Sequence, residues 1–243
     1  MIEEINARSA LTKSGIPVAQ YTINPYVGCT IGCKYCFARF IGAFKYTPGV
    51  WGRDVRVRKN IPEILAREIN RLGKTTVFLS SACDPYQHLE QKYGITRRIL
   101  TFLISHRIPV LLMSKSTLIR RDIDLLIKAE GEARVLVSIT TDREDVRRIL
   151  EPGSSTFSER LETLYLLKKN GIDAGAFLGP VLPMNAEKVS RELRKIVSTV
   201  HIDPLNYASQ VRAIYLEMGW KEWLHRERFE EVKSKLAESL VVE

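Results

Sequence analysis

The hydrophobic positions of the chain follow two periods. Apolar residues three or four positions apart predict amphipathic helices, and short apolar runs of about four to eight residues predict buried strands. The predicted strands cover residues 19–26, 75–80, 109–113, 133–139, 172–178 and 201–207. The predicted helices cover residues 61–72, 96–106, 119–130, 157–169, 186–200 and 223–240, with a shorter one over 34–44.

Strands therefore alternate with helices, which is the pattern of parallel βαβ units. Right-handed crossovers curl such units towards a barrel, and six units fall short of the eight that close one. We therefore expect an α/β fold, a partial (βα)6 TIM-type barrel. The chain has no internal repeat or linker, so we expect a single domain over residues 1–243. Its core would span about 19–207, and a helical C-terminal closure about 208–243.

Residues that typically begin and end helices support these limits. Asn60 is a good N-cap for the helix over 61–72, with Pro62 in its first turn. Gly73 ends that helix, and Asn170-Gly171 is a C-cap signal after the helix over 157–169.

Composition indicates a globular protein. Hydrophobic residues make up 45% of the 243 positions, which is typical of chains that bury a core. No apolar run approaches the roughly 18 residues that a membrane span needs. The N-terminal sequence MIEEINARSA lacks the apolar segment of a secretory signal.

The net charge is +9, and such a surface can attract nucleic acid or another acidic partner. The densest basic stretch contains Arg53, Arg56, Arg58 and Lys59. If it forms a strand, Arg56 and Arg58 share one face and Lys59 points away. The alternative is an ordinary solvated surface, which is what charge runs usually are.

The stretch NPYVGCTIGCKYCFARF, residues 24–40, carries the most specific chemistry. Its cysteines, Cys29, Cys33 and Cys36, have the spacing C-x3-C-x2-C. Three thiolates from one loop suit a soft metal centre, and in a four-iron cluster they leave one iron without a protein ligand. Gly28 and Gly32 let the backbone fold closely around such a centre. The alternatives are a zinc site short of one ligand and three unrelated core cysteines.

With Tyr35 before the last cysteine and Phe37 after it, the motif resembles the radical S-adenosylmethionine superfamily. The resemblance implies that the three cysteines hold a 4Fe–4S cluster. It implies that the amino and carboxylate groups of S-adenosylmethionine chelate the fourth iron. It also implies the partial barrel and a radical enzyme, which cleaves this cofactor reductively to a 5′-deoxyadenosyl radical that abstracts a hydrogen atom from a substrate.

Chemistry in parallel α/β folds gathers at the carboxyl ends of the strands. Nearly every predicted strand here is followed by residues that are polar, or rich in glycine and proline. These segments are 80–87, 114–116, 138–142, 179–183 and 206–207. A purely structural domain has no need for polar groups at almost every strand end.

Within the superfamily, the chain resembles the branch of spore photoproduct lyase and its DNA-repair-lyase-like relatives. The resembling segments are NPYVGCTIGCKYCFAR, SSACDPYQ, MSKS with Arg121-Asp122, VSI, and Glu151-Pro152 with Arg160. The resemblance implies that Lys115 and Ser138 contact S-adenosylmethionine. An ion pair of Glu151 with Arg160 is expected to order the loop after the fourth strand. The candidate cofactor-binding residues are Tyr35, Phe37, Ser81, Asp84, Lys115, Ser138 and Arg160.

The sequence departs from this branch at two positions. Spore photoproduct lyase uses a cysteine near the second strand end as hydrogen-atom donor, and that position is Ser81 here. Cys83 is the candidate catalytic residue in its place, and the alternative is that it is a small buried filler. Phe37 cannot donate a hydrogen bond as a tyrosine would. Both departures argue against repair of spore photoproduct itself.

Two other classes of function compete with the radical enzyme. One is a non-catalytic iron–sulfur electron-transfer protein, with Cys83 or His88 as fourth ligand. The other is a nucleic-acid-binding protein, for which Trp51 among the arginines is the only hint. For the enzyme we expect a reductant such as a ferredoxin or flavodoxin, nucleic acid as a candidate substrate, no membrane, a monomer, and the cytoplasm, because iron-binding thiolates need a reducing compartment.

Overall fold

The computed structural model describes residues 1–73 and 75–243. Within them, the main sheet has eight strands in the order β11-β10-β9-β8-β7-β6-β3-β2. All neighbouring strands from β3 to β11 run parallel, and β2 is antiparallel to β3. The bounds are β2 Thr12–Lys13, β3 Tyr21–Ile23, β6 Val77–Leu79, β7 Val110–Ser114, β8 Ala133–Ser138, β9 Asp173–Leu178, β10 Thr199–Ile202 and β11 Val241–Val242.

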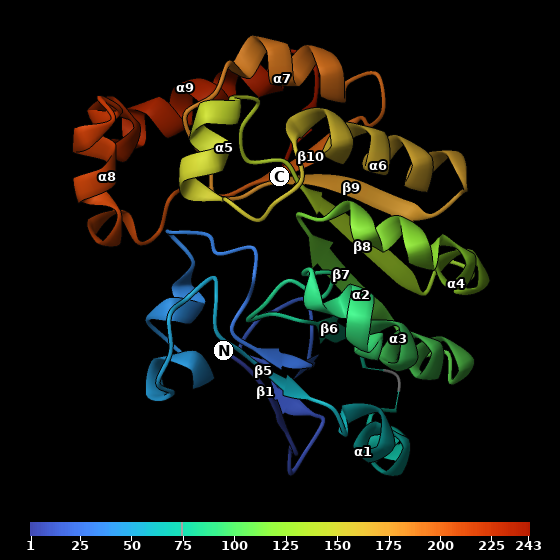
Figure 1. Ribbon diagram of the computed structural model, residues 1–243. Coiled ribbons are helices and arrows are strands. Elements are labelled where there is room, and N and C mark those ends of the chain that lie inside the picture. Colours follow the sequence, from blue (N-terminus) through green and yellow to red (C-terminus); the bar gives the residue numbers. More distant parts are fainter. Residues whose placement is uncertain (74) are drawn as a thin grey trace.

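A second sheet of three strands has the order β1-β5-β4. β5 (Val55–Arg58) lies in its centre, parallel to β1 (Ile2–Ile5) and antiparallel to β4 (Tyr26–Val27). Figure 1 shows this small sheet below β6 in the view. The basic stretch is therefore paired on both sides and is not a free edge.

Helices follow the strands in turn along the chain, as expected for βαβ units. Figure 1 shows α3, α4 and α6 along the outer side of the main sheet, and α8 and α9 at the upper left of the view. The bounds are α1 Ile61–Glu68, α2 Leu89–Tyr93, α3 Ile95–Ser105, α4 Ile123–Lys128, α5 Glu144–Leu150, α6 Phe157–Lys169, α7 Ala186–Leu193, α8 Arg212–Glu217 and α9 Arg226–Ala237.

The predicted partial TIM-type barrel is confirmed. The six predicted strands correspond to β3, β6, β7, β8, β9 and β10, neighbours in the main sheet. In the part of the chain that is described, the sheet ends at β2 and β11 and does not close on itself. β11 adds a parallel strand that the sequence did not predict. None of the described helices is long and apolar enough to cross a membrane.

The two faces of the sheet pack differently. Alternate residues such as Val77, Val110 and Val135 join the large core under the helices. The residues between them form a smaller cluster on the inner side of the open barrel, which contains Phe78, Leu111 and Leu136. Because strand residues alternate in direction, a residue two positions after Leu136 also faces inwards. That residue is Ser138, at the carboxyl end of β8.

Several predicted boundaries are wrong for local reasons. The helix over 34–44 is replaced by two short 3-10 helices, Phe37–Arg39 and Ala43–Tyr46, because Gly42 between them has a φ of 91°. The strand over 201–207 is Thr199–Ile202, and it ends before Pro204, which has no N–H to give to a ladder. Asn60 stands at the predicted N-cap, but its amide makes two hydrogen bonds with the backbone of Ala7.

Candidate cofactor site

The cysteine loop leaves the small sheet directly after β4. Gly28 and Gly32 have φ values of 93° and 69°, in the left-handed region that favours glycine. A Cβ at Gly28 would lie 2.5 Å from the backbone oxygen of Asp54. The loop thus depends on both glycines for its close turns.

One side of the loop is held by the segment that follows β6. Gln87 is fully buried, and its side-chain oxygen accepts a 2.9 Å hydrogen bond from the N–H of Thr30. Its amide nitrogen donates to the carbonyl of Gly28 at 3.3 Å. The backbone N–H of Asp84 donates to Sγ of Cys29 at 3.3 Å. Hydrogen bonds to a ligating sulfur are one means by which proteins tune a cluster.

The other side is held by the end of α5 and the loop after it. The N–H of Lys34 donates to the carbonyl of Leu150, and the N–H of Gly153 donates to the carbonyl of Ile31, both at 2.9 Å. A Cβ at Gly153 would lie 2.3 Å from the backbone oxygen of Thr30. Only glycine allows this contact. Sequence reasoning missed Gln87 and Gly153, because a single amide and a single glycine give no pattern.

The three motif cysteines line one cavity at the carboxyl ends of β6, β7 and β8. Burial raises the pKa of all three thiols, so binding a metal centre must release their protons. Five other candidate site residues line the same cavity: Ser81, Cys83, Asp84, Lys115 and Ser138. The remaining candidates, Tyr35, Phe37 and Arg160, lie outside this lining.

The donor set suits an iron–sulfur cluster, because thiolates are soft ligands and are the usual ligands of such clusters. In a four-iron cluster each cysteine binds a different iron, so the sulfurs surround a shared space, and the three motif cysteines line one cavity.

Two buried hydroxyls in the cavity wall have no hydrogen-bond partner among the residues that the structure describes. They belong to Ser138 and Ser80, which are 1% and 3% exposed. An unsatisfied buried hydroxyl costs about 1–3 kcal/mol, so a polar ligand would relieve both. Ser80 also has a φ of 71°, a strained conformation of the kind found at functional sites. The sequence marked the segment 80–87 as polar but did not single out Ser80.

Asp84 connects the ends of two strands. Its carboxylate accepts hydrogen bonds of 2.8 Å from the hydroxyl of Ser114 and from the backbone N–H of Lys115. Burial raises the pKa of this carboxyl, and the three hydrogen bonds that it accepts, one of them from the N–H of Tyr86, oppose that effect. Asp84 thus places the backbone that carries Lys115 at the cavity.

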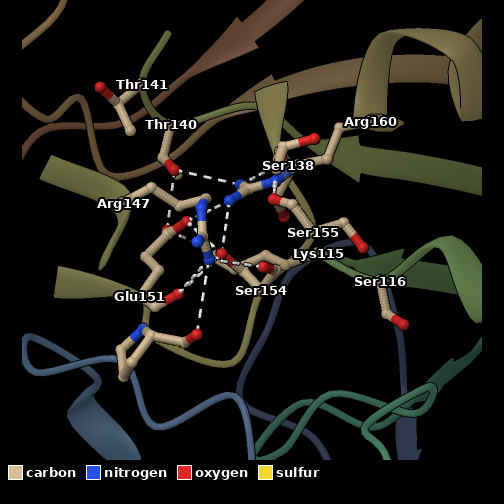
Figure 2. Close-up of polar contacts among 12 residues, drawn as sticks. Lys115, Ser116, Ser138, Thr140, Thr141, Arg147, Glu151, Ser154, Ser155 and Arg160 are labelled. Carbon is tan, nitrogen blue, oxygen red and sulfur yellow. Dashed lines mark hydrogen bonds and ion pairs between the residues drawn. The ribbon is translucent and has the colours of Figure 1, made fainter. Parts of the chain in front are cut away.

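The predicted ion pair of Glu151 with Arg160 is present and buried. The closest N···O distance is 2.6 Å, and the side chains are 0% and 1% exposed. Arg160 also donates to the carbonyls of Ser155 and Ser138 at 2.7 and 2.9 Å. Figure 2 shows how this guanidinium connects β8 to the loop that follows α5. Arg160 therefore positions Ser138 from outside the cavity.

Arg147 holds the same loop from its other side, and sequence reasoning missed it. Its guanidinium donates to the carbonyl of Ser154 at 2.7 Å (Figure 2). It also pairs with Glu144 at 2.7 Å. The loop then reaches the residue after β7, since the N–H of Ser155 donates to the carbonyl of Lys115 at 3.0 Å. One loop thus contacts both the cysteine loop and Lys115.

Glu151 stays ionised although it is buried. Burial raises its pKa, but the positive charges of Arg160 and Lys115 outweigh burial and lower it to about 2. The carboxylate accepts hydrogen bonds from the hydroxyls of Tyr35 and Thr140. Nζ of Lys115 lies 3.9 Å from it. Lys115 therefore reaches the cavity with its ammonium beside a fixed negative charge.

The basic stretch is largely neutralised by neighbouring acids. Arg56 pairs with Glu3 at 2.6 Å and Lys59 with Glu4 at 3.4 Å. Arg53 pairs with the adjacent Asp54 at 3.2 Å. Arg56 and Arg58 do share one face of β5, whose burial alternates along the strand. The interpretation as an ordinary solvated surface therefore fits Arg53, Arg56 and Lys59, and Arg58 alone differs from the rest.

An open parallel barrel with three cysteines around a cavity at its carboxyl edge defines an iron–sulfur protein of the α/β class. The model of the Radical SAM superfamily matches residues 23–196, and the chain therefore belongs to this superfamily. Its cofactors are a 4Fe–4S cluster and S-adenosylmethionine. The three cysteines, the unpartnered hydroxyls and Lys115 provide the thiolate and polar groups that these cofactors need.

Similar proteins are known at several distances. An uncharacterized protein of Methanocaldococcus jannaschii is 33% identical over 224 residues, which cover 91% of this chain and 84% of that protein. A radical SAM Nalpha-GlyT isomerase of Pseudomonas phage M6 is 24% identical over 160 residues, which cover 65% of this chain and 32% of the isomerase.

Among solved structures, spore photoproduct lyase with bound AdoMet and dinucleoside spore photoproduct has a TM-score of 0.66 and 17% identity. The match covers 88% of this chain and 65% of the lyase. At this identity, the likeness shows the fold alone.

Proposed function

We propose that this protein is a radical enzyme that abstracts a hydrogen atom from a nucleic-acid substrate. One observation carries the proposal: the three motif cysteines, Lys115 and the unpartnered hydroxyl of Ser138 line one cavity. When bound, the cofactors supply a 5′-deoxyadenosyl radical. The protein orients the cofactor and excludes water.

Lys115 and Ser138 are proposed to bind S-adenosylmethionine. The ammonium of Lys115 suits the cofactor's carboxylate, because a charge-assisted hydrogen bond is among the strongest polar contacts. The hydroxyl of Ser138 faces inwards at the end of β8 and suits the ribose or the amino-acid part. Arg160 donates to the carbonyl of Ser138 at 2.9 Å and so holds the backbone that carries this hydroxyl.

Cys83 is proposed to act as hydrogen-atom donor. Burial raises the pKa of its thiol to about 12, so the S–H bond is intact at neutral pH. Transfer of that hydrogen atom to a product radical leaves a thiyl radical on Cys83. One electron from the reductant, a ferredoxin or flavodoxin, and one proton from water restore the thiol.

Nucleic acid is proposed as the substrate class for two reasons. The chain carries a net charge of +9, and basic proteins attract polyanions. The fold is that of lyases solved with a dinucleoside lesion bound. The departures at Ser81 and Phe37 speak against spore photoproduct itself as the substrate.

The test is release of 5′-deoxyadenosine. The reconstituted protein is reduced with dithionite in the presence of S-adenosylmethionine, and product is measured by chromatography with and without single- and double-stranded oligonucleotides. We expect release in all cases, and deuterium in 5′-deoxyadenosine when the oligonucleotide is deuterated. The variant Cys33→Ala is the control without cluster. A fully loaded protein that releases no 5′-deoxyadenosine would contradict the proposal.

An electron-transfer protein is the second candidate, because Cys83 lines the cavity with the three motif cysteines. As a fourth ligand it would close the cluster against any cofactor. His88, the other ligand considered from the sequence, is exposed and does not line the cavity. The choice between the candidates therefore depends on Cys83 alone.

A further inference from the structure

The cavity lined by the three motif cysteines, Lys115 and Ser138 is here called the cofactor cavity, and a second cavity adjoins it. It lies between the N-terminal segment around β2, the region of Phe37 to Phe44 and the end of β5. Its volume of about 380 Å³ is within the range of small-molecule sites. Ser81 and Ala82 line both cavities. A molecule in the second cavity would thus contact the same two residues as the contents of the first.

The wall of this cavity is positively charged on one side. Arg58 and Lys13 line it together with the polar side chains of Asn24 and Ser81, and no Asp or Glu is among the lining residues described. An anion entering here would meet two cations and no opposing carboxylate.

Arg58 is the exceptional cation. It is half-buried, and in the described part of the chain the one hydrogen bond of its guanidinium goes to the carbonyl of Asn24, at 3.2 Å. No carboxylate pairs with it there, whereas Arg53, Arg56 and Lys59 each have one. Burial lowers the pKa of Arg58, as expected for a partly desolvated charge without a counterion. A charge in that situation is stabilised by an anion from outside the chain.

The other wall is apolar. Phe37 and Ile41 are 42% and 52% exposed at the rim, and Phe44 lies beside them. Exposed apolar residues next to a charged pocket are typical of binding sites. The cavity therefore suits a ligand with an oxyanion at one end and a flat or apolar part beside it.

We propose that this cavity, here called the Arg58 pocket, binds the oxyanion of the substrate, a phosphate or a carboxylate. A guanidinium binds either group through two parallel hydrogen bonds. The inference rests on the proposed function, because it places the reacting part of the substrate towards Ser81 and Ala82, at the cofactor cavity.

The experiment is calorimetry on the reconstituted protein with three probes. Thymidine 5′-monophosphate carries a phosphate, phenylacetate carries a carboxylate, and thymidine carries neither. We expect at least one of the two anions to bind, and Arg58→Gln to weaken that binding by about 10-fold or more. Thymidine should bind weakly, with no dependence on Arg58. The anion whose affinity depends on Arg58 shows whether the pocket binds a phosphate or a carboxylate.

Three variants make the result decisive. Arg56→Gln is the matched control on the same face of β5, and its pairing with Glu3 predicts unchanged anion binding. Arg58→Lys keeps the charge and should retain part of the affinity. Lys13→Gln, which removes the second cation without touching the contact with Asn24, should weaken binding about 2- to 5-fold by loss of a partly solvated charge.

Two results would overturn the inference: no binding of either anion, or equal affinity in the wild type and in Arg58→Gln. Release of 5′-deoxyadenosine without substrate is measured in parallel. If that release is absent in the wild type, the proposed function fails. If the release is normal and the anion affinity does not depend on Arg58, only the present inference fails.

Discussion

The role of Cys83 decides whether the cluster has three protein ligands, with one iron left for S-adenosylmethionine, or four. Its thiol lines the cofactor cavity, and burial keeps it protonated, with a pKa of about 12. A hydrogen-atom donor needs an intact S–H bond, whereas a fourth iron ligand must lose its proton. Because burial raises the pKa of the three motif thiols as well, the cluster content of a Cys83 variant is the observation that separates the two roles.

The first prediction concerns Cys83→Ala. We expect iron content to stay near four per chain, because three cysteines suffice when S-adenosylmethionine holds the remaining iron. Iron and sulfide analysis of the reconstituted protein measures this, and Cys33→Ala should lose the cluster. Loss of iron in Cys83→Ala would favour the electron-transfer candidate.

The second prediction concerns Ser138→Ala. Because its hydroxyl has no partner within residues 1–73 and 75–243, removing it should leave the free energy of unfolding of the cofactor-free protein unchanged or slightly higher. Affinity for S-adenosylmethionine should fall by about 1 kcal/mol through loss of one hydrogen bond. Denaturant unfolding and calorimetry check the two parts. Lower stability with unchanged affinity would assign the hydroxyl a structural role.

The third prediction concerns Lys115→Ala. Affinity for S-adenosylmethionine should fall by about 1.5–3 kcal/mol if a charge-assisted hydrogen bond to the carboxylate is lost. Calorimetry measures this, with Lys59→Ala as the control, because Lys59 is exposed and lies on the small sheet. An affinity equal to that of the wild type would remove Lys115 from the cofactor site.

At the scale of elements, the loop of residues 151–155 connects the cysteine loop to Lys115. It donates to the cysteine loop through the N–H of Gly153 and to the carbonyl of Lys115 through the N–H of Ser155. Arg147 and Arg160 hold it from two sides. The loop thus keeps the cysteine loop and Lys115 in a fixed relation.

The fourth prediction tests this loop with Gly153→Ala. The new methyl group would lie 2.3 Å from the oxygen of Thr30 and 2.9 Å from Cα of Ile31, so the two loops must separate. We expect normal folding by circular dichroism but a several-fold loss of cluster loading. Gly15→Ala is the matched control, because nothing lies within 4 Å of a Cβ built there. Full iron content in Gly153→Ala would show that the contact is dispensable.

Much of this element arrangement could be predicted from the sequence. Short apolar or alternating segments identified β6, β7, β8 and β9, because buried parallel strands are rich in apolar residues. β3 and β10 were predicted from weaker patterns, and their predicted limits are wrong. β1 and β2 were not predicted, since their residues are mostly exposed and give no alternation. Gln87 and Gly153 contact the cysteine loop over more than fifty intervening residues. Such long-range contacts leave no mark in any local window of sequence.

At the scale of the whole molecule, the buried ion pair of Glu151 with Arg160 couples stability to pH. The folded pKa of Glu151 is about 2, against an ordinary value of 4.5. Its contribution to stability is therefore fully present above about pH 4.5 and is lost as the pH falls towards 2.

The fifth prediction follows for Glu151→Gln. At pH 7 the variant should lose about 3–5 kcal/mol of unfolding free energy, because it leaves the buried Arg160 charge unpaired. The difference from the wild type should shrink as the pH falls from 4.5 towards 2. Denaturant unfolding of the cofactor-free proteins over this range measures it. A difference that does not depend on pH would mean that Glu151 is not ionised in the fold.

Asp84 gives the site a property that neither of its contacts shows alone. Its N–H donates to Sγ of Cys29, and its carboxylate holds the backbone of Lys115. Under the proposed function, the electron affinity of the cluster and the placement of the cofactor's carboxylate would both depend on the backbone that Asp84 holds in place. A substitution of Asp84 that moves this backbone would therefore change two measurable quantities together, the reduction potential of the cluster and the affinity for S-adenosylmethionine.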